Sequence, residues 1–468
     1  MAYAATRPEA APSAPSALYR AIWRWHFYAG LFVLPFLLVL ATTGLIMIYG
    51  NSVETFLGKK YFVEPGGARI DAVKQALAAQ AAVPGGTVTM YVAPPSADRS
   101  SVFVVTADGK EHVVSVDPHD GRVLGSIVKD DTLFYWARNI HGTLLLGKPG
   151  SWIIEVAAGL GVIMVLTGLY MWWPRDGRSA QVFIPNLAVR GRRLWKEFHV
   201  STGFYIAVFL LFFLISGLSW TPFWGAKMTQ AWSTFPAAKW DDVPLSDKTH
   251  ASMNHGALRE VPWALEETPM PASGSTAGIA GVPEGQPVNL DSVVLLARGI
   301  GFDQQFRINL PVGDDGVYTV SADSMDDDTN DPMGDRTVHI DQYTGKILAD
   351  VRFADYSLAG KAMAIGIALH QANLGLSNTA LNTAYCLSVI FLVVSGVVMW
   401  WKRRPAGSFA VPRYPRGYRL PAGILGIAVA VSVMFPLTGI AIAFFTVIDF
   451  LLPKRWKEGG PAALTQAG

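Results

Sequence analysis

Five long apolar stretches constrain this chain more than any other feature of its sequence. Each is long enough to cross a bilayer, which takes about 20 predominantly apolar residues. Only 16% of the 468 residues are charged, against about 25% in ordinary soluble domains, and few of these charges lie inside the stretches. The sequence therefore predicts a mostly α-helical, multi-pass membrane protein. The five stretches cover residues 27–49, 152–173, 200–224, 380–401 and 422–452.

The basic residues indicate which loops face the cytoplasm. Arginine and lysine are concentrated in the loops 175–197 and 403–420. By the positive-inside rule these loops are cytoplasmic, as is the N-terminal tail, and the long segments between them are outside. With flanking residues included, the expected order is a flexible tail (1–19), span one (20–50), an outer domain (51–140), an outer histidine segment with span two (141–174), a cytoplasmic loop (175–197), span three (198–224), a second outer domain (225–369), an outer histidine segment with span four (370–402), a cytoplasmic loop (403–420), span five (421–452) and a C-terminal tail (453–468).

Composition excludes several kinds of function. The net charge of +2 provides no basic field for nucleic acid. The single cysteine, Cys386, cannot form an intrachain disulfide, a CxxC redox pair or a structural zinc site. Any redox chemistry must therefore use a bound cofactor.

The chain contains an internal repeat. Span one opens with Trp25-His26-Phe27 and span three with Phe198-His199-Val200. In both spans, glycines follow the histidine after four and after eighteen residues: Gly30 and Gly44, and Gly203 and Gly217. Span five begins a third copy at Leu437-Thr438-Gly439, but the position eighteen residues before its glycine is Pro421. The third copy therefore lacks the histidine.

The outer segments repeat each other as well. Residues 114–124 and 338–348 alternate apolar and polar side chains around an Asp-x-x-x-Gly turn, which predicts hairpins. Upstream, residues 71–82 and 290–301 have helical spacing of apolar residues. Each outer domain is therefore expected to be a small α+β unit, in which a helix packs on an antiparallel sheet.

Each outer domain leads into a histidine and then a span. His141-Gly-Thr-Leu-Leu-Leu-Gly147 precedes span two, and His370-Gln-Ala-Asn-Leu-Gly-Leu376 precedes span four. Both spans end in Met-Trp-Trp, at residues 171–173 and 399–401. The order span, outer domain, histidine, span thus occurs twice.

Four of the nine histidines occupy repeat-equivalent positions at the membrane. His26 and His199 lie at the cytoplasmic ends of spans one and three, and His141 and His370 lie just outside spans two and four. An ionisable residue at the membrane is a functional candidate. One interpretation is four interfacial histidines with their polar tips among the headgroups, and the other is a set of metal ligands.

Among metal groups, the paired positions favour haem. Imidazole suits iron, zinc and copper, but structural zinc needs four ligands close together, and these histidines are divided between two membrane depths. Two histidines from facing helices can bind haem iron on both sides, and such a haem transfers electrons rather than activating oxygen. Two haems across about 30 Å of hydrocarbon would form a transmembrane electron path.

The other histidines and an acidic loop carry weaker signals. His250 and His255, in an outer loop, could contact a substrate or a metal ion. The aspartates of residues 323–335 lack the ligand spacing of a calcium loop, so a solvated loop is expected. Three histidines on or beside the hairpins are expected at the surface: His112, His119 and His339.

Together these features resemble one family, the PepSY-associated transmembrane proteins. The resemblance covers nearly the whole chain from Arg20 to Arg404. With the spans and the repeat, the sequence predicts a membrane protein, mostly α, with five transmembrane helices in a bundle and two α+β outer domains, internally duplicated; the resemblance implies that these domains are periplasmic and of PepSY type. The fifth span departs from a simple four-span core. The matching residues are Trp25-His26, the hairpins at 117–124 and 341–348, the segment 141–147, and the Met-Trp-Trp endings with Pro174-Arg175 and Lys402-Arg403 after them.

The resemblance also implies an activity. The family includes iron-regulated inner-membrane proteins of Gram-negative bacteria, some of which act as siderophore-iron reductases with haem in the membrane. Carried over, it implies an oxidoreductase with two haems, of b type, held by His26 with His199 and by His141 with His370. Electrons would pass from the cytoplasmic side to a ferric siderophore, which releases its iron as Fe(II).

The electron donor is expected to be a separate molecule, a flavin reductase or a quinol, because the cytoplasmic loops carry no GxGxxG after a predicted strand. Two alternatives remain open. One is a non-redox PepSY membrane protein that binds or regulates a periplasmic partner. The other is a siderophore permease, against which the absence of mid-membrane charge and of clear broken helices argues.

Overall fold

The computed structural model describes residues 16–56, 61–174, 183–227, 237–240, 242–254, 261–405, 410–412, 418–419 and 421–451. The chain divides into two compact units. The first, called the inner unit below, comprises residues 1–37, 155–214 and 391–468. The second, called the outer unit, comprises residues 38–154 and 215–390.

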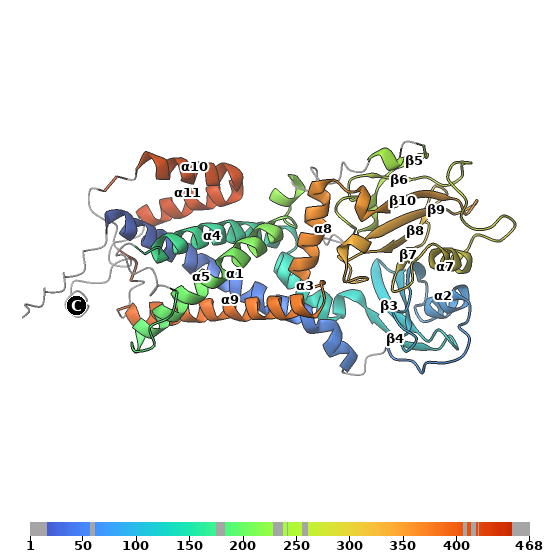
Figure 1. Cartoon of the computed structure of the whole chain (residues 1–468), viewed down its shortest axis with the longest axis horizontal. Helices are drawn as coiled ribbons and strands as arrows, with labels where there is room; N and C mark the ends of the chain where they lie inside the picture. Colours follow the sequence, from blue (N-terminus) through green and yellow to red (C-terminus); the bar gives the residue numbers. More distant parts are fainter. Residues whose placement is uncertain are drawn as a thin grey trace, which may run out of the picture. The chain divides into compact units, whose positions relative to one another are not determined.

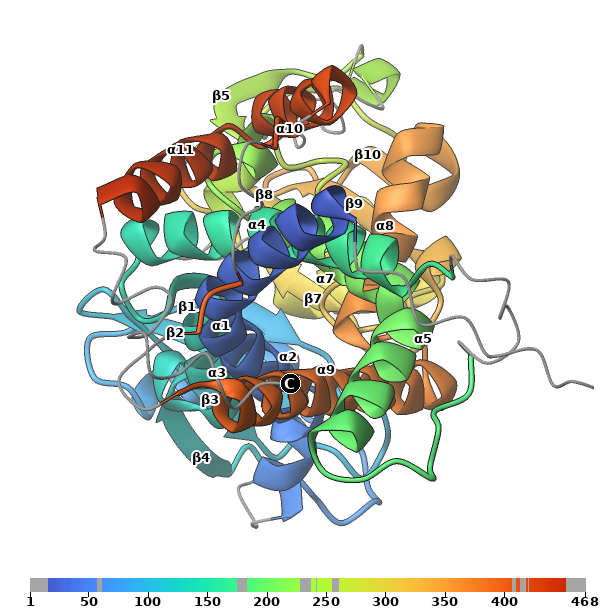
Figure 2. The same cartoon turned by 90° about the vertical axis from the view of Figure 1, so that its left-hand side faces the viewer.

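Four helices among the described residues are long and apolar enough to cross a membrane, and they correspond to predicted spans one to four. Their labels appear in Figure 2. In the inner unit they approach each other at glycines. A Cβ on Gly30 would lie 3.9 Å from Met164 Sδ, and one on Gly203 would lie 3.8 Å from Leu392. The helices are α1 (Ala17–Phe56), α4 (Lys148–Trp172), α5 (Arg192–Leu218) and α9 (Leu376–Arg403).

The expected fifth span is not one continuous helix. It is divided into α10 (Ala422–Met434) and α11 (Pro436–Leu451) (Figure 1). Pro436 has no N–H to donate to α10, so a new helix begins there. At 1.5 Å per residue the two helices reach only about 20 and 24 Å, short of the roughly 30 Å of hydrocarbon. The prediction that residues 422–452 form one continuous transmembrane helix is therefore wrong.

The two outer segments form one antiparallel sheet, with the strand order β10-β9-β8-β7-β1-β2-β3-β4. The predicted hairpins are confirmed as β3–β4 and β9–β10. The first half-sheet, β1 to β4, joins the second, β7 to β10, where Tyr91 pairs with Ile308. The strands are β1 (Thr87–Val92), β2 (Ser101–Ala107), β3 (Lys110–Val116), β4 (Val123–Val128), β7 (Arg307–Asn309), β8 (Val317–Ala322), β9 (Arg336–Asp341) and β10 (Ile347–Arg352).

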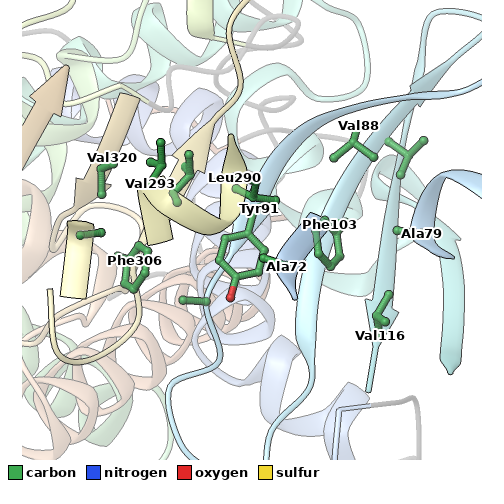
Figure 3. Packing of buried hydrophobic residues seen from close by; sticks show 14 of the residues in the cluster. Ala72, Ala79, Val88, Tyr91, Phe103, Val116, Leu290, Val293, Phe306 and Val320 are labelled. Atoms are coloured by element: carbon green, nitrogen blue, oxygen red, sulfur yellow. The ribbon is translucent and has the colours of Figure 1, made fainter. Parts of the chain in front are cut away.

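Both helices predicted from spacing are present, as α2 (Ala72–Ala81) and α7 (Leu290–Gly299). They pack on the sheet over a single apolar core that both half-sheets share (Figure 3). The Tyr91 ring lies 5.2 Å from Phe103 of its own half-sheet and 6.4 Å from Phe306, which precedes β7. The two expected outer domains thus share one hydrophobic core.

Two shorter helices carry the outer histidines: α3 (Leu133–Thr143) and α8 (Leu358–Gln371). A hydroxyl caps the N-terminus of each. Each ends just after its histidine at a left-handed residue, Leu144 (φ 52°) or Ala372 (φ 70°). The remaining elements are the strands β5 (Leu245–Thr249) and β6 (Pro269–Pro271) and the 3-10 helices η1 (Lys129–Asp131), η3 (Ala237–Trp240), η4 (His250–Met253), η5 (Pro332–Gly334) and η6 (Phe353–Asp355).

Candidate functional site

The inner unit brings two of the four predicted histidines near each other. His26 on α1 places Nδ1 3.0 Å from the Thr167 hydroxyl on α4. His199 on α5 places Nδ1 2.8 Å from the Ser395 hydroxyl on α9. The two imidazoles are close enough to interact electrostatically. Each ring is thus held by a hydroxyl of a neighbouring helix.

The outer unit brings the other two together in the same manner. His141 on α3 has its Nδ1 2.9 Å from the Thr43 hydroxyl on α1, and His370 on α8 has its Nδ1 2.7 Å from the Ser216 hydroxyl on α5. These two imidazoles also interact electrostatically. The structure thus places His26 and His199 in the inner unit and His141 and His370 in the outer unit; that each pair binds a metal stays a prediction.

The hydroxyls decide where the imidazole protons lie. The Thr43 hydroxyl donates its single hydrogen to Val39 O (2.7 Å), and Thr167 donates to Ile163 O (2.8 Å). A hydroxyl that donates to its own helix can only accept from the imidazole, so the histidine carries its proton on Nδ1. A neutral ring in this tautomer presents a lone pair at Nε2, the atom that binds metals. Ser395 follows the same pattern, because it donates to Leu392 O.

A glycine follows each hydroxyl residue and lies against the same imidazole. A Cβ on Gly168 would lie 3.2 Å from His26 Cε1, and a Cβ on Gly44 would lie 3.9 Å from His141 Cε1. A Cβ on Gly217 or Gly396 would meet the corresponding histidine at 3.7 Å. The glycines therefore leave the space in which each ring packs directly against a helix backbone.

This hydroxyl-glycine pair is the functional signal that the sequence reasoning missed. The repeat identifies Gly44 and Gly217, but the residue before each is not connected there with a histidine. The pair is Thr43-Gly44, Thr167-Gly168, Ser216-Gly217 and Ser395-Gly396 in the four long helices, and Thr438-Gly439 in α11. In the last case no histidine is involved: a Cβ on Gly159 of α4 would collide with the Thr438 hydroxyl.

Buried amides fix the end of the helix that carries His370. Asn382 is 1% exposed and donates to Leu369 O (2.8 Å) and His370 O (3.1 Å). On the other side of the pair, Ser151 donates to Gly142 O (2.9 Å). Each contact satisfies carbonyl groups at a helix end that have no partner within the helix. Both outer histidines therefore lie on firmly anchored backbone.

Comparison with known proteins gives one match. The family model described as the PepSY-associated TM region covers residues 23–403. The chain belongs to this family. Among curated proteins, none matches the chain. The region that matches the PepSY-associated family includes all four histidines with their hydroxyl partners, and it excludes α10 and α11.

One expectation about the remaining histidines needs correction. His339 was expected at the surface, but it is fully buried on β9. It contacts His250, which is also fully buried, rather than solvent. Burial lowers the pKa of His250 to about 4 and that of His339 well below its usual value, so both are neutral at pH 7. His112 and His119 are half-buried, and His255 lies outside the described residues.

Three of the six aspartates of the acidic loop are buried, which is contrary to the expected solvated loop. Asp323, Asp328 and Asp335 are 2%, 5% and 4% exposed. Arg307 on β7 is the cation that compensates part of this charge, with Nε 3.0 Å from Asp328 and Nη1 2.8 Å from Asp326. The expectation failed because the balancing arginine comes from a neighbouring strand and not from the loop.

Proposed function

We propose that this protein is an inner-membrane di-haem reductase. It passes electrons from the cytoplasmic side to a periplasmic acceptor, a ferric siderophore, and so releases iron as Fe(II). The observation that supports this most is the histidine–hydroxyl–glycine arrangement, which occurs twice in each unit. The N-terminus and basic loops are then cytoplasmic, and the sheet is periplasmic.

The donor set fits haem of b type. In each pair, two imidazoles come from different helices, and at least three of the four rings carry the proton on Nδ1. Metal-bound histidines characteristically donate their other ring N–H to a fixed oxygen. When bound, haem would supply reversible one-electron chemistry.

The chain's own residues orient the ligands. His26 with His199 would hold one haem, and His141 with His370 the other. A hydroxyl keeps each imidazole from rotating about its Cβ–Cγ bond. The four hydroxyls belong to Thr43, Thr167, Ser216 and Ser395. Fixed rings make electron transfer faster, because little structure has to rearrange when the charge of the site changes.

Aromatic contacts connect the outer pair with the second half of the outer unit. The Trp220 ring lies 5.2 Å from His370 and 4.8 Å from Trp263, which is 2% exposed. Packed rings are a better path for electron tunnelling than a gap or a water layer. Trp220 and Trp263 would serve as this path away from His370, and neither ring would itself be oxidised or reduced.

The donor in this proposal is a separate flavin reductase or membrane quinol. The acceptor takes one electron for each Fe(III) reduced to Fe(II). Oxygen donors bind Fe(II) less tightly than Fe(III), so reduction loosens the siderophore complex. Iron can then be captured by another ligand.

An absorption spectrum of the purified protein, first oxidised and then reduced with dithionite, tests the proposal. Sharp bands of low-spin haem are expected. A colourless protein would instead favour the non-redox alternative, in which the family's periplasmic domains bind or regulate a partner. A ferric siderophore added to the reduced protein should reoxidise it, with Fe(II) trapped by a coloured chelator.

Ligand variants test the pairing. His141→Ala or His370→Ala should remove about half of the haem, and His26→Ala or His199→Ala the other half, because bis-histidine ligation fails when either ligand is lost. His112→Ala, which changes a half-buried histidine on β3, is the matched control and should retain both haems. Loss of both haems from any single change would contradict two independent pairs.

A further inference from the structure

A second histidine pair lies in the outer unit, apart from the four histidines discussed above. His250 on η4 and His339 on β9 have no exposed surface, and their Nε2 atoms are 2.9 Å apart. The Trp240 ring packs against both imidazoles, with centroid distances of 5.4 and 5.8 Å. Two imidazole nitrogens thus point at each other in an enclosed space.

The outward-facing nitrogens are held in the way that suits metal ligands. His250 Nδ1 lies 2.9 Å from Thr268 O, a carbonyl that can only accept, so the proton is on Nδ1 and a lone pair is on Nε2. His339 Nδ1 lies 3.0 Å from the Thr319 hydroxyl, which can either donate or accept. His339 can therefore also move its proton to Nδ1 and present a second lone pair.

Soft donors lie beside His250. One cavity is lined by His250 together with Met90 and Met253, and also by Asp323 and Arg307. Thioether and imidazole donors together favour Cu(I) over the harder divalent ions. The described residues hold no cluster of three or more His, Cys, Asp or Glu side chains that could bind a metal. A four-ligand zinc site of those residue types is therefore not formed there.

The fold itself does not require this histidine. The two predicted hairpins align Val338-His339-Ile340 with Val114-Ser115-Val116, so the equivalent position on β3 is a serine. Ser115 is buried as well, with 2% exposure. A buried polar residue without a packing requirement is a candidate for binding.

We propose that His250 and His339 form a Cu(I) site, with Met253 or Met90 as an additional sulfur ligand. The cation takes the place of the hydrogen bond between the two Nε2 atoms. With metal–nitrogen bonds of about 2 Å, these atoms are separated by at most about 4 Å, so the rings move apart by no more than about 1 Å on binding. No electron transfer is involved, and the site does not depend on the proposed reductase function.

Anaerobic competition with a chromophoric Cu(I) chelator tests the site in the purified full-length protein. The wild type should take up one more equivalent of Cu(I) than His339→Ser, which installs the residue of the equivalent hairpin. Loss of one of two nitrogen ligands should weaken binding by at least about tenfold. His112→Ser, on β3, is the control and should bind Cu(I) as the wild type does. Equal uptake by His339→Ser and the wild type would overturn the proposal.

A second measurement tests the proposal even if His339→Ser does not fold, because it uses the wild type. X-ray absorption of the wild type loaded with one equivalent of Cu(I) should show nitrogen ligands at about 2 Å, and Met253→Leu should reduce any sulfur contribution. A first shell with no nitrogen would overturn the proposal even if copper binds. The haem spectrum is recorded in parallel, because the Cu(I) result should be the same whether or not the four membrane histidines hold haem.

Discussion

The two half-sheets differ most in how their second and third strands are connected. β2 and β3 are joined by Asp108-Gly109, which both have positive φ (50° and 72°), as in a tight type I′ turn. The equivalent strands β8 and β9 are joined by residues 323–335, the acidic loop. The same framework therefore carries a minimal connection in one half and an elaborate one in the other.

The acidic loop links the second half-sheet to the helix of His370. Asn373, just after α8, donates to Ser324 O at 2.8 Å. Met325 packs in a cluster with Ile367 of α8 and with Trp263. On the first half-sheet, the tight turn is too short to reach a neighbouring helix. The acidic loop therefore anchors the helix of His370 to the second half-sheet.

The largest effect on stability is expected from removing Arg307, the side chain of β7 that pairs with Asp326 and Asp328 of the acidic loop. Arg307→Met leaves Asp328 buried without its ion-pair partner, and the loss of one member of a buried pair costs about 3–5 kcal/mol. Denaturant unfolding of the purified protein measures the change. On the first half-sheet, Arg122 is 70% exposed and 3.8 Å from its carboxylate partners.

Arg122→Met is therefore the matched control, with an expected change below about 1 kcal/mol. If both arginine variants lost the same stability, the acidic loop would be no more important than an ordinary surface ion pair. The two half-sheets would then not differ in how much their ion pairs contribute to the free energy of unfolding.

A pH-dependent difference sharpens the comparison further. Burial raises the pKa of Asp335 from 3.8 to about 7. Between these values the folded state holds a proton that the unfolded chain has released, so this group favours folding increasingly as the pH falls from 7 to 3.8. At pH 8 the full cost of the buried carboxylate is present, up to about 4 kcal/mol.

Asp335→Asn should therefore stabilise the protein at pH 8 and have little effect at pH 4. Thermal unfolding at both pH values measures it, and the exposed Asp130→Asn is the control. A stability difference that is independent of pH would mean that Asp335 acts through its hydrogen bonds to Ser324, not through its ionisation.

Local sequence patterns were sufficient for most of the secondary structure. The helices at α2 and α7 and the hairpins β3–β4 and β9–β10 follow from apolar spacing alone. The break at Pro436 also had a local signal, because proline inside an apolar run interrupts a helix. The single sheet had none, since the pairing of β1 with β7 joins residues more than two hundred positions apart.

The candidate site was predictable in part for the same reason. The four histidines stand out because the repeat places them at equivalent positions. Their partners do not, since Thr167 supports His26 from another helix. A serine or threonine before each repeated glycine was the available signal. The burial of His339 was unpredictable, because its partner His250 lies on a segment with no equivalent in the first half-sheet.

The smallest expected effect tests whether the tight turn between β2 and β3 is constrained only by its backbone conformation. Gly109 has a φ of 72°, and a Cβ added there would meet nothing within 4 Å. Gly109→Ala therefore changes only the backbone preference, and a left-handed residue with a Cβ costs about 1 kcal/mol.

Gly125 on β4 also has open space around a Cβ but no positive φ. Gly125→Ala should therefore stabilise the strand by roughly 0.5–1 kcal/mol, because glycine is unfavourable inside a strand. Opposite signs in denaturant unfolding would show that the first connection is limited by backbone geometry alone. A loss well above 1 kcal/mol at Gly109 would instead mean that this turn makes contacts of its own, and the two half-sheets would be less different than their loops suggest.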